Sequence, residues 1–109
     1  MVIRIAALPF DRQCQLVGLP VPVAELKFHP DRRWRFDWAF QSQRLALEVQ
    51  GAVFTQGRHT RGPALLKEHE KLNAAAALGW RVLFVTPSQI ANGGAVAIAQ
   101  AALTQSARS

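Results

Sequence analysis

The sequence has little cysteine, few acidic residues and no long apolar run. Cys14 is the only cysteine among 109 residues, which excludes an intramolecular disulfide and a cluster of thiolate metal ligands. Nowhere do about eighteen apolar residues follow one another, and residues 1–10 lack an apolar core behind a basic start. We therefore expect a cytoplasmic protein with no membrane partner. Internal repeats and linkers are also absent, and the length predicts a single domain over residues 1–109.

The shortage of acidic residues leaves the chain strongly basic. Thirteen Lys and Arg against seven Asp and Glu give a formal charge of +6, while half of all residues are apolar and can form one compact core. A basic excess favours a polyanionic partner, most commonly nucleic acid, and the alternative is a basic surface that only serves solubility. Nine of the thirteen basic residues lie between Lys27 and Lys71, in the segment that also holds the candidate chemistry.

The sequence pattern predicts a short helix, then three strands, and then helix, strand and helix. A period of two marks the strands, and the polar connector 41–44 has the length of a hairpin loop. Pro63 and Gly79 favour the two ends of a helix. The sequence thus predicts an α/β fold with a mixed β-sheet, an antiparallel hairpin, a parallel crossover strand and flanking helices. The expected helices cover 10–18, 62–79 and 94–103, and the expected strands cover 23–28, 34–40, 45–49 and 82–86.

The same periodicity predicts which side chains are buried. The strand 34–40 is expected to be half buried, with its aromatic residues on one face and Arg35, Asp37 and Ala39 on the other. The aromatic residues of that strand are Trp34, Phe36, Trp38 and Phe40. The expected core stripe of the helix 62–79 consists of Leu65, Leu72, Ala75 and Ala76.

Asp37 and Glu48 are expected to face each other across the hairpin. If the chain turns symmetrically about 41–44, Phe40 faces Leu45 and the two carboxylates have Cβ atoms about 5 Å apart. Like charges at that distance destabilise a sheet unless something compensates. A divalent cation such as Mg²⁺ would compensate. Arg35 and Gln50 share the expected face, and Arg35 is a candidate to contact DNA phosphate or to neutralise a carboxylate. The alternative is that both carboxylates are solvated residues on an outer face, held in ordinary ion pairs by arginines such as Arg33, Arg35 or Arg44.

A glycine-flanked basic loop, 56–62, leads into the helix that begins near Pro63. Backbone N–H groups and the helix dipole favour anions at such an N-terminus, so we expect Arg58 and Arg61 to contact phosphate. His59 is a candidate to orient or deprotonate water, since its side chain titrates near neutral pH. The alternative is a loop that is only exposed and polar.

Lys67 and Lys71 lie one helical turn apart, on the side away from the expected Leu65 and Leu72 stripe. Two interpretations are open: ion pairs with Glu68 or Glu70, or a sharper role in which one lysine reaches the carboxylates and orients the attacking water. Lys67 is also a candidate DNA contact.

Several segments resemble a known group of enzymes. Asp37, followed after eleven residues by Glu48-Val49-Gln50, resembles the signature of the PD-(D/E)XK nuclease superfamily, with Gln50 where lysine is usual. Three segments resemble small phage and prophage endonuclease-like proteins, and the last of them ends in a stretch, 78–83, that is similar to very-short-patch repair endonucleases. The three segments are 28–37, 57–62 and 71–83, within a resemblance that covers roughly 25–87.

The resemblance implies a restriction-endonuclease-like core that hydrolyses DNA phosphodiester bonds with Mg²⁺ or Mn²⁺. Asp37 and Glu48 would be metal ligands, the residue at Gln50 would assist the water, and Glu25 is a candidate third carboxylate. Gln50 removes the usual cationic group, which Lys67 or Lys71 would replace; otherwise the chain is a non-catalytic DNA-binding module.

A nuclease of this size that cuts both strands is expected to form a homodimer. A two-carboxylate glycosidase has little support, because no aromatic sugar cleft can be inferred and a basic charge has no use there.

Overall fold

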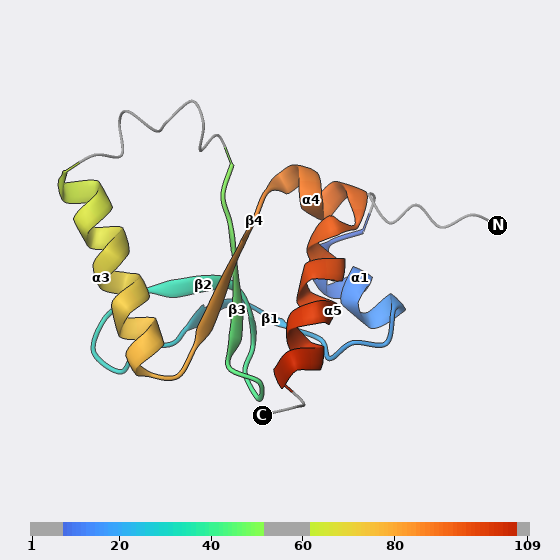
Figure 1. Cartoon of the computed structure of the whole chain (residues 1–109), viewed down its shortest axis with the longest axis horizontal. Coiled ribbons are helices and arrows are strands. Elements are labelled where there is room, and N and C mark those ends of the chain that lie inside the picture. The colour runs from blue at the N-terminus through green and yellow to red at the C-terminus, as the bar shows by residue number, and fades with distance from the viewer. Residues whose placement is uncertain (1–7, 52–61, 107–109) are drawn as a thin grey trace.

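A four-stranded mixed sheet lies between helices and gives the chain an α/β fold (Figure 1). The computed structural model describes residues 8–51 and 62–106. The sheet order is β1-β2-β3-β4, in which β1, β2 and β3 pair antiparallel and β4 runs parallel to β3. The predicted mixed sheet, with its hairpin and its parallel strand, is therefore confirmed. The strands are β1 (Val23–Lys27), β2 (Arg35–Phe40), β3 (Leu45–Val49) and β4 (Arg81–Val85).

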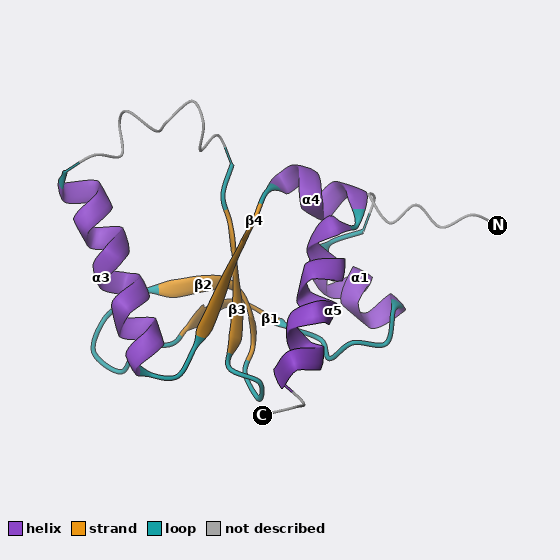
Figure 2. Ribbon diagram, viewed as in Figure 1, coloured by secondary structure: helices purple, strands orange, loops and turns teal. Residues whose placement is uncertain are grey.

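Helices cover both faces of the sheet (Figure 2). Helix α3 (Pro63–Ala77) lies on one side, and α1 (Phe10–Leu16) and α5 (Gly94–Ser106) lie on the other. Because helices lie on both sides of the sheet, strand β2 is covered on both faces, and the expectation of a half-buried strand is wrong.

None of the helices within 8–51 and 62–106 is long and apolar enough to cross a membrane.

The short helix α4 (Pro87–Asn92) was not expected from the sequence. Thr86, predicted as the last strand residue, is its N-cap: the hydroxyl accepts from the Gln89 N–H at 3.2 Å and the Gln89 side chain accepts from the Thr86 N–H at 2.9 Å. Gly93 ends the helix with a left-handed backbone, φ 84°. Helix α5 begins at Gly94, as the Gly93-Gly94 pair predicts.

The sheet separates two apolar clusters, one on each face. On the α1/α5 side, Phe10 and Cys14 pack with Phe40, Leu45 and Leu47 beneath helix α5. On the α3 side a smaller cluster joins small residues of the sheet and helix to two large rings. Its buried members are Phe36, Ala39, Ala46, Ala75 and Trp80, and Leu26, Phe28 and Val82 pack against them.

Strand β2 does not keep one alternation along its whole length. Trp38 contacts Phe10 on the α1/α5 side with ring centroids 5.6 Å apart, whereas Phe36 stacks on Phe28 at 3.9 Å in the α3-side cluster. The prediction that all aromatic residues of this strand share a face is thus wrong. The change of face falls at Asp37, and Glu25, which lies opposite Asp37 in the β1–β2 register, has a left-handed backbone with φ 54°.

Helix α3 ends as the sequence predicts but does not bury the expected stripe. Gly79 has φ 85° and donates to the Ala76 carbonyl, and Trp80 donates to the Ala75 carbonyl, so the chain turns back and places Trp80 in the cluster. Ala75 is buried, but Leu65 is 44% exposed and Ala76 is exposed as well. The predicted stripe is wrong at Leu65 because only the C-terminal part of α3 packs closely on the sheet, and at Ala76 because this position lies about 100° around the helix from the buried Ala75.

Candidate functional site

The hairpin brings Asp37 and Glu48 together in the register that the sequence predicts. Phe40 pairs with Leu45 and Trp38 with Leu47, so the next position on each strand places Asp37 opposite Glu48. At this point backbone N–H groups bond to the two carboxylates across the strands. The Asp37 N–H donates to Glu48 Oε2 at 3.1 Å, and the Val49 N–H donates to Asp37 Oδ2 at 2.6 Å. Each side chain is therefore fixed by the backbone of the opposite strand.

Lys71 of helix α3 compensates the negative charge of this pair. Its Nζ donates to Glu48 Oε1, and the side chains of Lys71 and Glu48 are 15% and 6% exposed. The ammonium also lies over the Phe36 ring, 5.9 Å from its centroid. Two interpretations of the lysines were open. Lys71 fits the one in which a lysine reaches the carboxylates.

The alternative of a solvated outer face with arginine ion pairs is wrong for Glu48. Glu48 is only 5% exposed and lies beneath α3. Two of the three arginines named for that role bond elsewhere: Arg35 pairs with Glu25 at 3.8 Å, and Arg44 donates to the Leu78 carbonyl at 3.1 Å.

Burial and neighbouring charges act in opposite directions on Glu48. Loss of hydration raises the pKa of the Glu48 carboxyl above its ordinary value, and the negative charge of Asp37 adds to this rise. The bond from Lys71, the positive charge of Lys71 and the Asp37 N–H lower the same pKa, but the net result is a raised pKa, with burial the largest cause. A buried carboxyl group needs an adjacent cation to keep its negative charge. Such a group is therefore suited to bind a cation.

The sheet face beside Glu48 is open on the β4 side. Glu48 lies next to Phe84 in the parallel β3–β4 register, and Phe84 is 46% exposed. Helix α3 therefore covers Glu48 without closing the neighbouring surface. Nothing in the sequence pattern predicted this, since Phe84 belongs to an apolar run that is typical of a strand buried on both faces.

Within residues 8–51 and 62–106, none of the remaining candidate side chains is bonded to Asp37 or Glu48. Glu25 is exposed and pairs with Arg35, and residues 8–51 and 62–106 hold no group of three or more His, Cys, Asp or Glu placed to bind a metal ion. Gln50 continues β3 through its N–H, which donates to the Val85 carbonyl at 2.8 Å. Lys67 is exposed on α3. Arg58, His59 and Arg61 lie outside the described residues.

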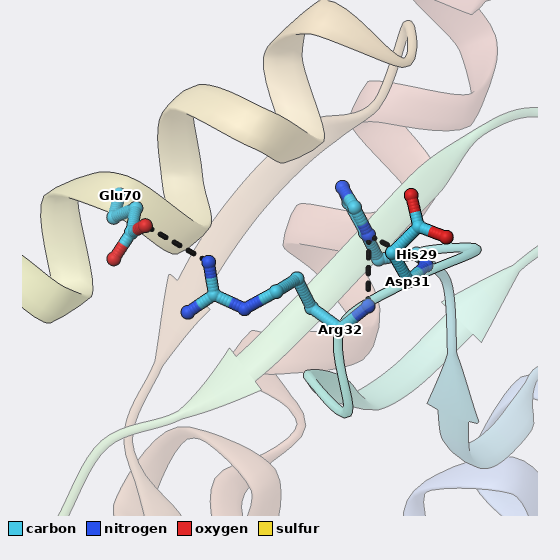
Figure 3. A network of polar contacts seen from close by, with 4 residues as sticks. All are labelled: His29, Asp31, Arg32 and Glu70. Atoms are coloured by element: carbon cyan, nitrogen blue, oxygen red, sulfur yellow. Dashed lines mark hydrogen bonds and ion pairs between the residues drawn. The ribbon is translucent and has the colours of Figure 1, made fainter.

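A second polar group near helix α3 was not identified from the sequence. Arg32 Nη1 bonds Glu70 Oε2 at 2.9 Å, which joins the β1–β2 turn to α3 at the residue before Lys71 (Figure 3). The bonded Arg32 guanidinium lowers the pKa of Glu70, and the charge of Lys67 lowers it further. The charges alone could not have predicted this pair, because 38 residues separate its members.

The arrangement can bind a cation between two strands and one helix. Glu48 Oε1 already holds an ammonium, and Asp37 Oδ1 has no hydrogen-bond partner among residues 8–51 and 62–106. Mg²⁺ is commonly bound by one or two carboxylates together with water and substrate phosphate. Comparisons of the chain with protein-family models, curated proteins and solved structures found no match.

Proposed function

We propose that the chain is a metal-dependent endonuclease that hydrolyses DNA phosphodiester bonds, with Mg²⁺ or Mn²⁺ held by Asp37 and Glu48. The observation that carries the proposal is the pair of carboxylates fixed by each other's strands, one of which is buried and bonded to an ammonium. Their resemblance to the PD-(D/E)XK signature supports a restriction-endonuclease-like core, with which a mixed sheet between helices is compatible.

The donor set fits a hard divalent cation. One oxygen of each carboxylate is held by a backbone N–H, which leaves Asp37 Oδ1 as one donor for a metal, and Glu48 Oε1 as a second donor once the metal displaces the Lys71 ammonium from it. A bound Mg²⁺ or Mn²⁺ would stabilise the negative charge that develops during phosphodiester hydrolysis. The backbone bonds orient both carboxylates before any ligand arrives, so little rearrangement of the strands is needed.

Lys71 supplies the positive charge that Gln50 does not. The signature usually has lysine two residues after the glutamate, where this chain has an uncharged amide. Lys71 reaches the same glutamate from helix α3. We assign it the task of holding a phosphate oxygen or the attacking water beside Glu48, while the basic residues between Lys27 and Lys71 attract the DNA backbone. Cutting both strands would require a homodimer.

Cleavage of supercoiled, linear and branched DNA with Mg²⁺, Mn²⁺ or EDTA tests the proposal. We expect wild-type protein to cut with metal and not with EDTA. Asp37→Asn and Glu48→Gln should lower the cleavage rate at least about a hundredfold, because each removes a charged metal ligand. Glu68→Gln is the matched control on α3 and should cut as wild type does.

A non-catalytic DNA-binding module is the second candidate. It is favoured by the ammonium already bonded to Glu48 and by the amide at Gln50. Binding that weakens as salt is added, without cutting of any substrate, would support this module and reject the nuclease. Failure to bind or cut any DNA would reject both.

A further inference from the structure

Helix α3 is anchored to the sheet chiefly at its C-terminal end. Ala75 is its one buried residue within the described chain, and Trp80 packs beside it after the turn at Gly79. Toward the other end, Leu65 and Leu66 are 44% and 67% exposed. Apolar packing therefore fixes the end of the helix but gives its middle, where Lys71 lies, little support.

Two polar contacts at consecutive positions fix the middle of α3. Glu70 is bonded to Arg32 of the β1–β2 turn at 2.9 Å, and Lys71 is bonded to Glu48 of β3. Neighbouring helix positions point about 100° apart, so the two contacts hold the helix from different directions. Rotation of α3 that kept one contact would stretch the other. The position of the Lys71 ammonium thus depends on the Glu70 contact.

Arg32 is itself held in place by the turn. The backbone N–H groups of Asp31 and Arg32 donate to His29 Nδ1 at 3.1 and 3.0 Å, as Figure 3 shows. The Arg32 guanidinium also lies 4.0 Å from the centroid of the Trp34 ring. An arginine whose backbone N–H and guanidinium are each already held by one contact loses less conformational entropy when the guanidinium bonds a further group.

The turn and the carboxylate site share one aromatic stack. The Trp34 ring stacks against Phe28 at 6.3 Å between centroids, and Phe28 stacks on Phe36 at 3.9 Å. Lys71 lies over the Phe36 ring. The guanidinium of Arg32 and the ammonium of Lys71 therefore contact opposite ends of the same row of rings.

We propose that His29, Arg32 and Glu70 are positioning residues that hold helix α3 so that Lys71 reaches Glu48. His29 orders the turn, Arg32 bridges from the turn to the helix, and Glu70 transmits this constraint to the next residue. The catalytic consequence rests on the proposed nuclease function, since it requires Lys71 to act on bound DNA. The positioning itself does not depend on that function.

Protection of the Lys71 amine from acetylation reports directly on whether Lys71 reaches Glu48. Acetic anhydride would be applied to the folded full-length chain, and acetylation of Lys71 would be compared with that of exposed Lys27 by mass spectrometry. Glu70→Gln and Arg32→Gln should each increase the Lys71 to Lys27 ratio about threefold to fivefold, the range expected for loss of one exposed ion pair. Arg32→Lys, which keeps the charge but not the planar guanidinium, should give an intermediate ratio.

Two matched controls separate positioning from a general change in charge. Glu68→Gln removes the same charge from the same helix, and Arg33→Gln removes an exposed arginine that has no bonded partner in the described residues. Both variants should leave the ratio unchanged. Protection of the buried Cys14 from thiol reagents would confirm that each variant is folded.

The outcomes distinguish this inference from the proposed function. An unchanged Lys71 ratio in Glu70→Gln and Arg32→Gln, or an equal rise in Glu68→Gln, would overturn the inference whether or not the protein cuts DNA. Absence of cleavage by wild type would reject the nuclease while the acetylation ratio still decided the positioning. If the protein does cut, Glu70→Gln should lower kcat about threefold to fivefold with little change in KM, because the DNA-binding charge is retained.

Discussion

The two faces of the sheet are covered by helices that make different kinds of contact. On the α1/α5 side, large apolar residues of several elements are fully buried, among them Phe10, Phe40, Leu45 and Leu47. On the α3 side the apolar cluster is smaller, and polar bonds at Glu70 and Lys71 hold the middle of the helix. One face is closed by apolar burial, and the other is held partly by charge.

This difference explains where the carboxylates lie. A buried Glu48 needs a compensating cation, and a tightly packed apolar face has no place for one. The α3 side provides Lys71, and the exposed Phe84 shows that the neighbouring sheet surface is accessible. The apolar face stabilises the scaffold, while the α3 side holds the carboxylate pair and the lysine bonded to it.

The largest difference in the free energy of unfolding is expected between leucine-to-alanine substitutions on the two sides of the sheet. Leu47→Ala removes a fully buried side chain and should lower the free energy of unfolding by about 3–5 kcal/mol through lost packing and a cavity. Leu66→Ala, at an α3 position that is 67% exposed, should change it by less than about 0.5 kcal/mol. Urea unfolding measures both. Equal losses would mean that α3 packs as tightly as the other helices.

A smaller loss is expected when the charge that holds α3 is removed. Lys71→Met leaves Glu48 buried without its cation and should lower the free energy of unfolding by about 2–3 kcal/mol. Lys67→Met, at an exposed position of the same helix, is the control and should cost less than about 0.5 kcal/mol. Adding Glu48→Gln to Lys71→Met should recover part of the loss; without recovery the two residues would not be coupled.

The same pair of variants tests how the carboxylates would bind metal. In the proposed function, Lys71→Met removes an ammonium that competes with Mn²⁺ for Glu48 Oε1, so Mn²⁺ should bind about tenfold more tightly. Lys67→Met should bind as wild type does. Titration calorimetry without DNA gives the affinity. Weaker binding by Lys71→Met would show that lysine and metal do not share this oxygen.

The mildest test asks whether the α1/α5 side excludes water. Burial raises the pKa of the Cys14 thiol to about 12. Between pH 9 and 12 the unfolded chain loses this proton and the folded chain keeps it, so stability should fall as pH rises through this window. The free energy of unfolding should decline more steeply for wild type than for Cys14→Ala, by up to about 1.4 kcal/mol per pH unit. Equal slopes would indicate a hydrated thiol.

Local patterns predicted the strands and the central register well. The alternation in 45–49 and the polar connector 41–44 led to a pairing of Phe40 with Leu45, which the structure confirms. This succeeded because a hairpin of fixed loop length permits few registers once one face must be buried. The opposition of Asp37 and Glu48 follows from that register.

The sequence pattern gave wrong predictions of burial where the position of another element, rather than the local spacing of apolar residues, decides which side chains are covered. Phe36 alternates with Trp38 in sequence, yet it joins the α3-side cluster because Phe28 and Trp80 provide rings to pack against. Leu65 follows the helical period but is exposed, because the sheet does not extend beneath that end of α3. Helix α4 is only six residues long, and a helix so short has a weak apolar period.

The sequence by itself determined the order of the main elements, the hairpin register and the placement of Asp37 opposite Glu48, because each depends on neighbouring residues and on turns with few geometries. Only the tertiary structure decided that Lys71 is the cation bonded to Glu48 and that Arg32 bonds Glu70. These contacts join residues 23 and 38 positions apart. Which residues meet depends on how α3 lies against the sheet, and the spacing of apolar residues within one helix or strand does not specify this.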